Sequence, residues 1–175
     1  MFKEYNKIVA QILLTRDGVE NPLRRKNARN TINELLKMGI IPIINENDTV
    51  STHEIEFGDN DTLSAIVSSL ISADLLIILS DIDGMYTSNP KESNKARLIP
   101  KVIDLSEDLE TYIFSNNSAF GTGGMTSKLV AARHCLENNI DMVITNGADP
   151  AVIFDVLAGK NVGTHFVSRS LIQTV

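Results

Sequence analysis

The chain has 175 residues, of which 43% are hydrophobic and 22% are charged, and this composition is typical of one globular domain. Its net charge of -6 argues against a nucleic acid or an anionic membrane as its partner. No segment reaches the ~18 apolar residues of a membrane-spanning helix. Cys135 is the only cysteine, which predicts a buried structural thiol and a reducing, cytoplasmic location.

The first half of the chain alternates short apolar runs with segments of helical periodicity. Asn21 followed by Pro22 is a typical helix start, and Gly39 is a typical helix end. The pattern predicts a strand over 8–14, a polar segment over 15–18, a helix from Pro22 to Gly39, a strand over 40–44, a loop or hairpin over 49–57 and a helix over 63–71.

The second half continues this alternation, and its strands are continuously apolar, as in sheets that are buried on both faces. It predicts a strand over 75–79, an excursion loop over 86–101, a short strand over 102–103, a helix start over 106–109, a loop over 115–122, a helix over 125–138, a strand over 142–145, a helix capped by Asp149 and a strand over 163–167. We therefore predict an α/β fold, a three-layer α/β/α sandwich with a mainly parallel sheet.

Four polar clusters follow predicted strands or precede predicted helices: 45–48, 58–61, 80–84 and 121–128. In open α/β sheets, ligands bind at the edge where parallel strands end, so these clusters are expected to line one cleft. The alternative is that each cluster is only a turn or a helix cap, since Asn, Asp and Gly are favoured there.

The cluster over 121–128 contains three glycines in its first four residues and ends on Lys128. Glycine permits a sharp turn and a close approach to a ligand, and the N–H groups of the following helix favour an anion. The segment lacks the Gly-x-x-x-x-Gly-Lys-Ser/Thr spacing of a Walker A loop. It therefore predicts either a phosphate site of another architecture or a glycine-rich cap of an ordinary helix.

The charges of the clusters divide into two kinds. The acidic and amide-rich clusters suit a substrate with an ammonium group, whereas the glycine-rich cluster with Lys128 suits phosphates. Asp61 is a candidate to orient Lys128 or a metal-bound nucleotide. The three histidines, His53, His134 and His165, lack the spacing of metal ligands, so we expect no protein-bound metal and only Mg²⁺ carried by a nucleotide.

Five motifs follow one another over nearly the whole chain: Ala-Gln-Ile-Leu-Leu-Thr (10–15), Pro-Ile-Ile-Asn-Glu-Asn-Asp (42–48), Phe-Gly-Asp-Asn-Asp (57–61), Leu-Ser-Asp-Ile-Asp-Gly-Met-Tyr (79–86) and Gly-Thr-Gly-Gly-Met-Thr-Ser-Lys (121–128). Together these motifs resemble, in the same order, those of the glutamate 5-kinases of the amino-acid kinase family. The resemblance implies that ATP phosphorylates the γ-carboxylate of L-glutamate, the first step of proline synthesis.

The resemblance also implies a role for individual residues. Asp48 and Asn60 correspond to positions that hold glutamate, and Asp61 to the aspartate that organises the catalytic lysines. Lys128 corresponds to the lysine that stabilises the transferring phosphoryl group. The implied nucleotide contacts are Ser80, Asp81, Thr122, Gly123, Gly124, Met125, Thr126, Ser127 and Lys128.

ATP with Mg²⁺ and L-glutamate are the implied ligands, and many family members are oligomers that proline inhibits. The family's first strand and its Lys-x-Gly-Ser turn have no counterpart here, and neither does a C-terminal PUA domain. Residues 1–175 are thus expected to form the later portion of one kinase domain, and the chain alone to be a poor catalyst. The alternatives are a non-catalytic amino-acid or nucleotide binder and the kinase half of a pyrroline-5-carboxylate synthase.

Overall fold

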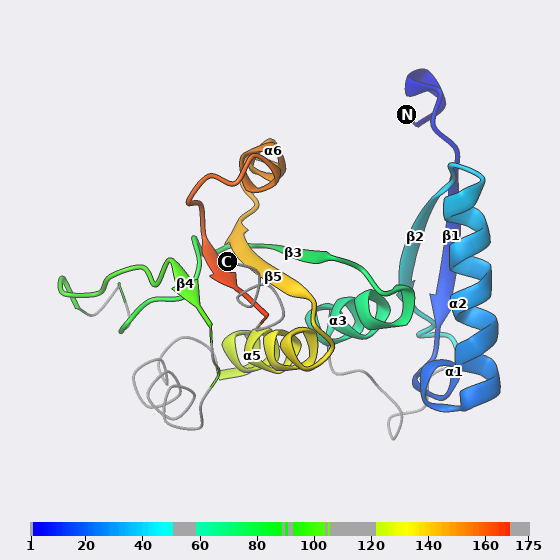
Figure 1. Cartoon of the computed structure of the whole chain (residues 1–175), viewed down its shortest axis with the longest axis horizontal. Coiled ribbons are helices and arrows are strands. Elements are labelled where there is room, and N and C mark those ends of the chain that lie inside the picture. Colours follow the sequence, from blue (N-terminus) through cyan, green and yellow to red (C-terminus); the bar gives the residue numbers. More distant parts are fainter. Residues whose placement is uncertain are drawn as a thin grey trace, which may run out of the picture. The chain divides into compact units, whose positions relative to one another are not determined.

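A computed structural model describes residues 2–50, 59–88, 90, 93–103, 105 and 122–168. The chain forms two compact units, unit 1 over Met1–Ile71 and unit 2 over Ser72–Val175 (Figure 1). The expectation of a single domain over residues 1–175 stays a prediction. The segments expected over 51–57, 106–109 and 115–121 lie outside the described residues.

Unit 1 contains a parallel pair of strands with helices beside it (Figure 1). Strands β1 and β2 run in register from the pair Val9 and Ile41 to the pair Leu14 and Glu46. In chain order, the elements are the 3-10 helix η1 (Phe2–Tyr5), β1 (Val9–Leu14), α1 (Arg16–Glu20), α2 (Pro22–Lys37), β2 (Ile41–Glu46) and α3 (Asn60–Ile71).

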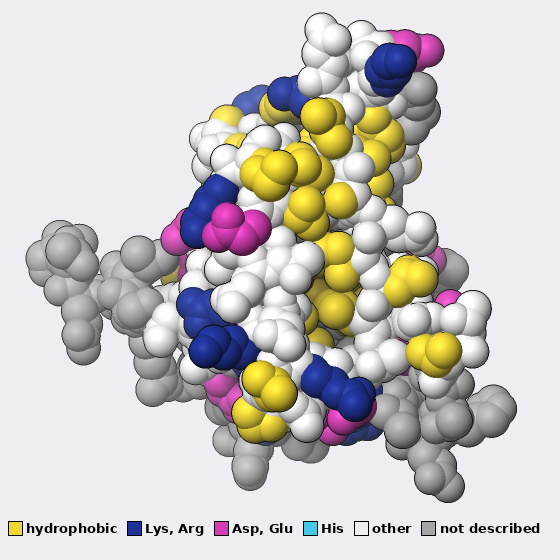
Figure 2. All heavy atoms as spheres, turned by 90° about the vertical axis from the view of Figure 1, so that its right-hand side faces the viewer, with side chains coloured by type: hydrophobic (Ala, Val, Ile, Leu, Met, Phe, Trp, Pro, Cys, Tyr) yellow, Lys and Arg dark blue, Asp and Glu magenta, His cyan; other side chains and the backbone are white. Residues whose placement is uncertain are grey.

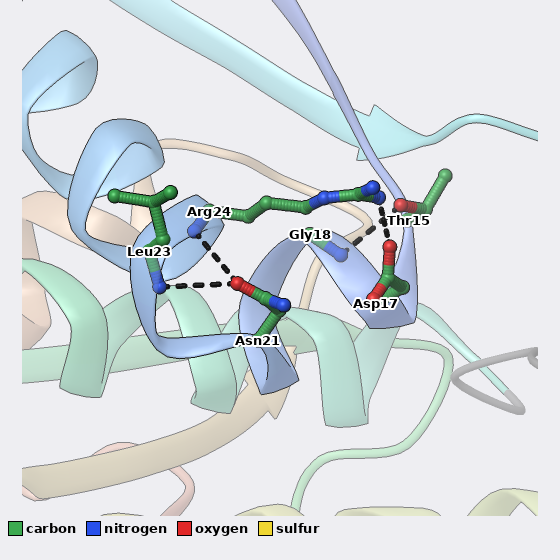
Figure 3. A network of polar contacts seen from close by, with 6 residues as sticks. All are labelled: Thr15, Asp17, Gly18, Asn21, Leu23 and Arg24. Atoms are coloured by element: carbon green, nitrogen blue, oxygen red, sulfur yellow. Dashed lines mark hydrogen bonds and ion pairs between the residues drawn. The ribbon is translucent and has the colours of Figure 1, made fainter.

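Strand β1 ends at Leu14, before the predicted polar segment over 15–18, but the sequence pattern does not predict helix α1, which begins within that segment. Thr15 has an extended backbone, and its Oγ1 accepts a hydrogen bond from the N–H of Gly18 at 3.1 Å (Figure 3). This is the geometry of a helix N-cap. A helix of five residues is too short to show apolar periodicity, and the cap was its only signal.

Helix α2 begins where the pair Asn21 and Pro22 predicts it. The Oδ1 of Asn21 accepts hydrogen bonds from the N–H groups of Leu23 and Arg24, at 3.1 and 3.2 Å (Figure 3). The Arg24 guanidinium also forms an ion pair with Asp17 of α1, which ties the two helices together. Gly39, with a φ of 71°, follows the end of α2 as predicted.

The core of unit 1 lies between one face of the β1–β2 pair and the helices. One cluster in this core has the buried members Leu14, Val19 and Leu63, against which Ile12, Ala28, Ile44, Ile66 and Val67 pack. Leu13, Ile41 and Ile43, on alternate positions of the same strands, are 44–45% exposed. Figure 2 views the molecule from the side of α2 and shows apolar side chains gathered there in a band.

Unit 2 contains a four-stranded sheet in the order β3-β5-β6-β4. Strand β5 is buried from Met142 to Thr145, and helices α5 and α6 both pack against it. The elements of this unit are β3 (Leu75–Ser80), β4 (Lys101–Val102), α5 (Thr122–Glu137), β5 (Asp141–Asn146), α6 (Val152–Leu157) and β6 (Thr164–Phe166).

The predicted α/β class with mainly parallel strands is confirmed, since β1–β2, β3–β5 and β4–β6 are parallel. Strand β6, however, pairs with β5 in the antiparallel direction. Helix α6 has only six residues, about 9 Å, which is shorter than the ~20 Å of the six-residue strand β5. The chain is therefore not carried back to the start of β5, and β6 begins beside the end of β5, where Gly163 lies against Ile144.

The segment expected as an irregular excursion over 86–101 is closed at its base by antiparallel pairing. Tyr86 and Leu98 form an isolated β-bridge, and the N–H of Ile99 donates to the carbonyl of Met85 at 2.7 Å. Thr164 of β6 joins both sides, because its Oγ1 accepts from the N–H of Met85 at 2.8 Å and donates to the carbonyl of Ile99 at 2.6 Å.

Candidate functional site

In unit 1, the polar residues after β2 form a turn that is bonded to the end of β1. The N–H of Asn47 donates to the carbonyl of Leu14 at 2.8 Å, and Asp48 is exposed in the turn that follows. Strand β2 extends through Glu46, so the predicted strand end at Ile44 is two residues early. Among the expected glutamate contacts, Asp48 is therefore accessible to a ligand.

The cluster before α3 lies mostly inside the first turn of that helix. The Oδ1 of Asp59 accepts a hydrogen bond from the N–H of Thr62 at 2.9 Å, so Asp59 serves as a cap. Asn60 is exposed and Asp61 is half-buried, and both are helical. The cap interpretation thus accounts for Asp59, while Asn60 and Asp61 remain candidates for binding and catalysis.

Leu14 brings these two segments of unit 1 to the same region. Its carbonyl accepts from Asn47, and its side chain belongs to the same core cluster as Leu63, in the first turn of α3. The turn that carries Asp48 and the helix start that carries Asn60 therefore both adjoin the end of β1. The structure brings the acidic and amide-rich candidates of unit 1 together in this way.

In unit 2, Ser80 and Asp81 lie where β3 ends. Ser80 pairs with Asn146, the last residue of β5, and the N–H of Gly147 donates to the carbonyl of Ser80 at 2.8 Å. The hydroxyl of Ser80 donates to Oδ1 of Asp81 at 3.2 Å, and Asp81 is exposed. Both expected nucleotide contacts are thus at the carboxyl edge of two parallel strands.

Two residues next to this edge have no assigned role in the sequence interpretation, Asp83 and Asn146. The Nδ2 of Asn146 donates to Oδ1 of Asp83 at 2.8 Å, and the hydroxyl of Tyr86 donates to Oδ2 of Asp83 at 3.1 Å. Burial, followed by the hydrogen bond and the negative charge of Asp83, raises the pKa of Tyr86 above its usual value. The signal that could identify Asn146 is its place at the end of a strand that pairs in parallel with β3.

The glycine-rich segment is helical from Thr122, so the prediction of a turn before a helix beginning near Met125 is wrong. Glycine is unfavourable inside a helix but tolerated in its first turn, where the amide groups lack intrahelical partners anyway. Gly124 is exposed and has open space where a Cβ would lie. The expected contacts from Thr122 to Ser127 are therefore the first residues of α5.

Lys128 and Ser127 differ in burial although they are adjacent. Ser127 is 9% exposed, and its hydroxyl donates to the carbonyl of Gly124 at 3.0 Å, so it serves the helix. Lys128 is half-buried, and its Nζ reaches the same carbonyl at 3.4 Å, a long contact. Of the two, Lys128 is the better placed to meet an anion.

Helix α5 and strand β5 run in opposite directions, since residues 138–140 join them and they pack against each other (Figure 1). The first turn of α5 therefore lies toward the end of β5 at Asn146, beside Ser80. The start of α5 and the ends of β3 and β5 therefore face the same side of the sheet, as the topology rule predicts. Backbone N–H groups, a lysine and a serine–aspartate pair can together bind a phosphorylated ligand.

Within the described ranges, no group of three or more His, Cys, Asp and Glu side chains could hold a metal ion. The helices described are also too short or too polar to cross a membrane. Cys135 is fully buried on α5, and its burial raises its pKa to about 11. Its thiol is therefore protonated at neutral pH and unsuited to act as a nucleophile.

Two curated proteins are similar to this chain over most of its length. The chain is 49% identical over 172 residues to a glutamate 5-kinase of Listeria monocytogenes serotype 4a (strain HCC23), covering 96% of this chain and 62% of the relative. It is 48% identical to a glutamate 5-kinase of Clostridium perfringens (strain 13 / Type A), covering 96% of this chain and 64% of the relative. The chain thus spans somewhat less than two thirds of these curated relatives.

A solved structure shares the fold at much lower identity. The isopentenyl phosphate kinase of T. acidophilum, in a product complex, superimposes with a TM-score of 0.62 at 16% identity, covering 94% of this chain and 62% of that one. The model of the amino acid kinase family matches residues 1–146, which include every candidate site residue. This chain belongs to the amino acid kinase family.

Proposed function

We propose that this chain takes part in the ATP-dependent phosphorylation of the γ-carboxylate of L-glutamate, the first step of proline synthesis. The observation that supports this most directly is its 49% identity, over 96% of its length, to a protein named glutamate 5-kinase. Since the chain spans 62% of that relative, the activity of the whole relative is extended to this chain as a proposal.

The proposed contacts to glutamate belong to unit 1. Asp48 and Asn60 are exposed, and Leu14 connects their segments. A carboxylate and a side-chain amide can accept hydrogen bonds from the α-ammonium group, and the amide can also donate to the α-carboxylate. These two residues would therefore recognise an amino acid by both of its charged groups.

Unit 2 supplies the contacts to ATP in this proposal. Ser80, Asp81 and the residues from Thr122 to Lys128 adjoin one sheet edge, and the N–H groups at the start of α5 suit phosphate oxygens. Mg²⁺ would arrive with the nucleotide, because the described residues offer no metal cluster of their own. When bound, MgATP supplies the phosphoryl group and neutralises part of its charge.

Phosphoryl transfer asks the protein mainly for positioning and for positive charge. An oxygen of the γ-carboxylate forms a bond to the γ-phosphorus, while the bond from that phosphorus to the bridging oxygen breaks and ADP leaves. The ammonium of Lys128 would stabilise the negative charge on the transferring group. The resemblance also assigns a catalytic role to Asp61, which is half-buried in the first turn of α3.

The resemblance supports four further parts of the proposal. We propose that the protein acts in the cytoplasm, that it assembles as a homo-oligomer and that proline is a candidate inhibitor. Residues 1–175 would belong to one kinase domain that contains both units. None of these parts is needed for the assignment of glutamate and ATP as substrates.

The test is glutamate-dependent release of ADP by the full chain, with calorimetric titrations of L-glutamate and of ADP with Mg²⁺ beside it. Lys128→Ala should lower the rate by about 10²–10³-fold, as for the loss of one donor to a transition-state charge. Lys37→Ala is the matched control, since Lys37 is a helical lysine that pairs with Glu34 on the exposed surface. It should leave the rate unchanged.

The outcomes separate the enzyme from the binder. Turnover that depends on Lys128 supports the kinase assignment. Saturable binding of both ligands without turnover would identify the chain as an amino-acid and nucleotide binder. Binding of neither glutamate nor ADP would overturn the proposed function.

A further inference from the structure

The carboxylate of Asp83 is held on both of its oxygens by other side chains. Oδ1 accepts from Nδ2 of Asn146 at 2.8 Å, and Oδ2 accepts from the hydroxyl of Tyr86 at 3.1 Å. The two partners come from different places, Asn146 from the end of β5 and Tyr86 from the start of the excursion. Both contacts lie within unit 2, beside the edge that carries Ser80 and Asp81.

The side chain of Asn146 has a fixed orientation in this arrangement. Its Oδ1 accepts from the N–H of Ala148 at 2.9 Å, so its Nδ2 is the atom that remains to donate to Asp83. The backbone already joins the same strand ends, because the N–H of Gly147 donates to the carbonyl of Ser80 at 2.8 Å. The side-chain bond adds a second attachment, in the middle of the turn over 80–84.

The far end of this turn is held as firmly. Gly84 has a φ of 150°, and a Cβ at this position would lie 2.7 Å from Oγ1 of Thr164. The same Oγ1 accepts from the N–H of Met85 at 2.8 Å. The turn is therefore attached at its start, its middle and its end, which is the preorganisation that a binding turn needs.

We propose that the pair Asp83–Asn146 positions the turn over 80–84, so that Ser80 and Asp81 meet the nucleotide in one fixed geometry. The proposal rests on the proposed function, and it separates the roles of two aspartates. Both aspartates are exposed, but the carboxylate of Asp83 is bonded to Asn146 and Tyr86, so Asp81 contacts the ligand and Asp83 acts through these two partners. Loss of the pair should weaken nucleotide binding and leave glutamate binding unchanged.

The decisive variants are Asn146→Asp and the exchange Asp83→Asn with Asn146→Asp. The single substitution places two carboxylates against each other, and the dissociation constant for ADP with Mg²⁺ should rise by about tenfold or more. The exchange restores an amide facing a carboxylate and keeps the wild-type net charge. The new Asp can accept from Ala148 and from the new Asn, whose oxygen accepts from Tyr86.

The double variant should bind ADP with an affinity within about threefold of the wild type. This recovery would show that the hydrogen bond between residues 83 and 146 is what matters. Asn161→Asp is the charge-matched control, because Asn161 is exposed in the same unit. It adds the same charge as Asn146→Asp and should leave ADP affinity unchanged. Calorimetric titrations with ADP and with L-glutamate, on each full-length variant, measure both affinities.

Tyr86→Phe removes only the second bond to Asp83 and provides a reading that does not depend on the folding of Asn146→Asp. It should raise the dissociation constant for ADP by about three- to tenfold. The proposal would be overturned if ADP affinity is unchanged in Asn146→Asp or in Tyr86→Phe. It would also be overturned if the exchange does not restore ADP affinity, or if glutamate affinity falls as much as ADP affinity. A wild-type chain that binds no ADP would instead overturn the proposed function on which it rests.

Discussion

The two units use parallel strands with similar apolar sequences in different ways. In unit 2, β5 lies between two strands, packs against α5 and α6, and is buried from Met142 to Thr145. In unit 1, exposure alternates along β1 and β2, and the helices cover the face that carries Leu14. A continuous apolar run therefore shows that a strand can be buried on both faces, while its neighbours decide whether it is.

The largest difference in stability between the two units is expected when Ala replaces two glycines that share the same backbone conformation. Gly163→Ala should lower the free energy of unfolding by about 2–5 kcal/mol, the sum of a left-handed backbone cost and overpacking. Both terms apply because φ is +71° and a Cβ would lie 2.1 Å from the carbonyl oxygen of Ile144. Urea titration followed by circular dichroism measures the change.

Gly39→Ala in unit 1 is the matched variant. Its φ is also +71°, but nothing lies within 4 Å of the added Cβ, so only the backbone cost of about 1–2 kcal/mol applies. Equal losses in the two variants would show that packing at Gly163 does not matter.

A second contrast concerns the strands themselves. Ile144 is 0% exposed in β5, and Ile144→Ala should lower the free energy of unfolding by about 2–5 kcal/mol. Ile43 is 45% exposed in β2, so Ile43→Ala should cost about 1 kcal/mol. The same urea titrations test this, and a larger loss for Ile43→Ala would contradict the contrast between the two sheets.

The pH dependence of stability should reveal the burial of Cys135 in unit 2. Its pKa is raised from about 9 to about 11 by burial, so the unfolded chain loses this proton before the folded chain does. The protonated thiol therefore contributes about 2–3 kcal/mol to the free energy of unfolding below pH 9, and this contribution is lost as the pH rises toward 11. Cys135→Ala should remove that part of the pH dependence, and subtraction of its urea titrations from those of the wild type isolates it. Parallel curves between pH 8 and 11 would show that the thiol is not buried.

The smallest effect is expected at the start of α2 in unit 1. Asn21→Ala removes the acceptor for the N–H groups of Leu23 and Arg24 and should cost about 1 kcal/mol. Asn30→Ala, in the exposed middle of the same helix, should be neutral or slightly stabilising. Thermal unfolding of both variants distinguishes a cap from a general effect of replacing asparagine.

The sequence predicted most elements because their signals are local. Asn21 and Pro22 specify a helix start, Gly39 a helix end, and the apolar runs the strands. Strand direction is not local, which is why the sequence predicts the strand β6 but not its antiparallel direction. It depends on how far the short α6 can carry the chain.

In the candidate site, too, local signals could be predicted from the sequence and contacts between distant residues could not. Position after a strand or at a helix start pointed to the clusters that contain Ser80, Asp81 and Lys128, and the resemblance implied their roles. The bond between Asp83 and Asn146 joins residues 63 positions apart, and no local pattern reports such a pair. Its discovery required the register of β3 against β5.

Thr164 has a consequence for how the chain can vary. Because it fastens Met85 and Ile99 to β6, the base of the excursion is closed whatever lies between Thr87 and Arg97. The entropic free-energy cost of closing a loop grows slowly with its length, by about 0.6 kcal/mol for each doubling. This segment is therefore a permissive place for inserted sequence, where an affinity tag or a recognition peptide could be added without disturbing the sheet.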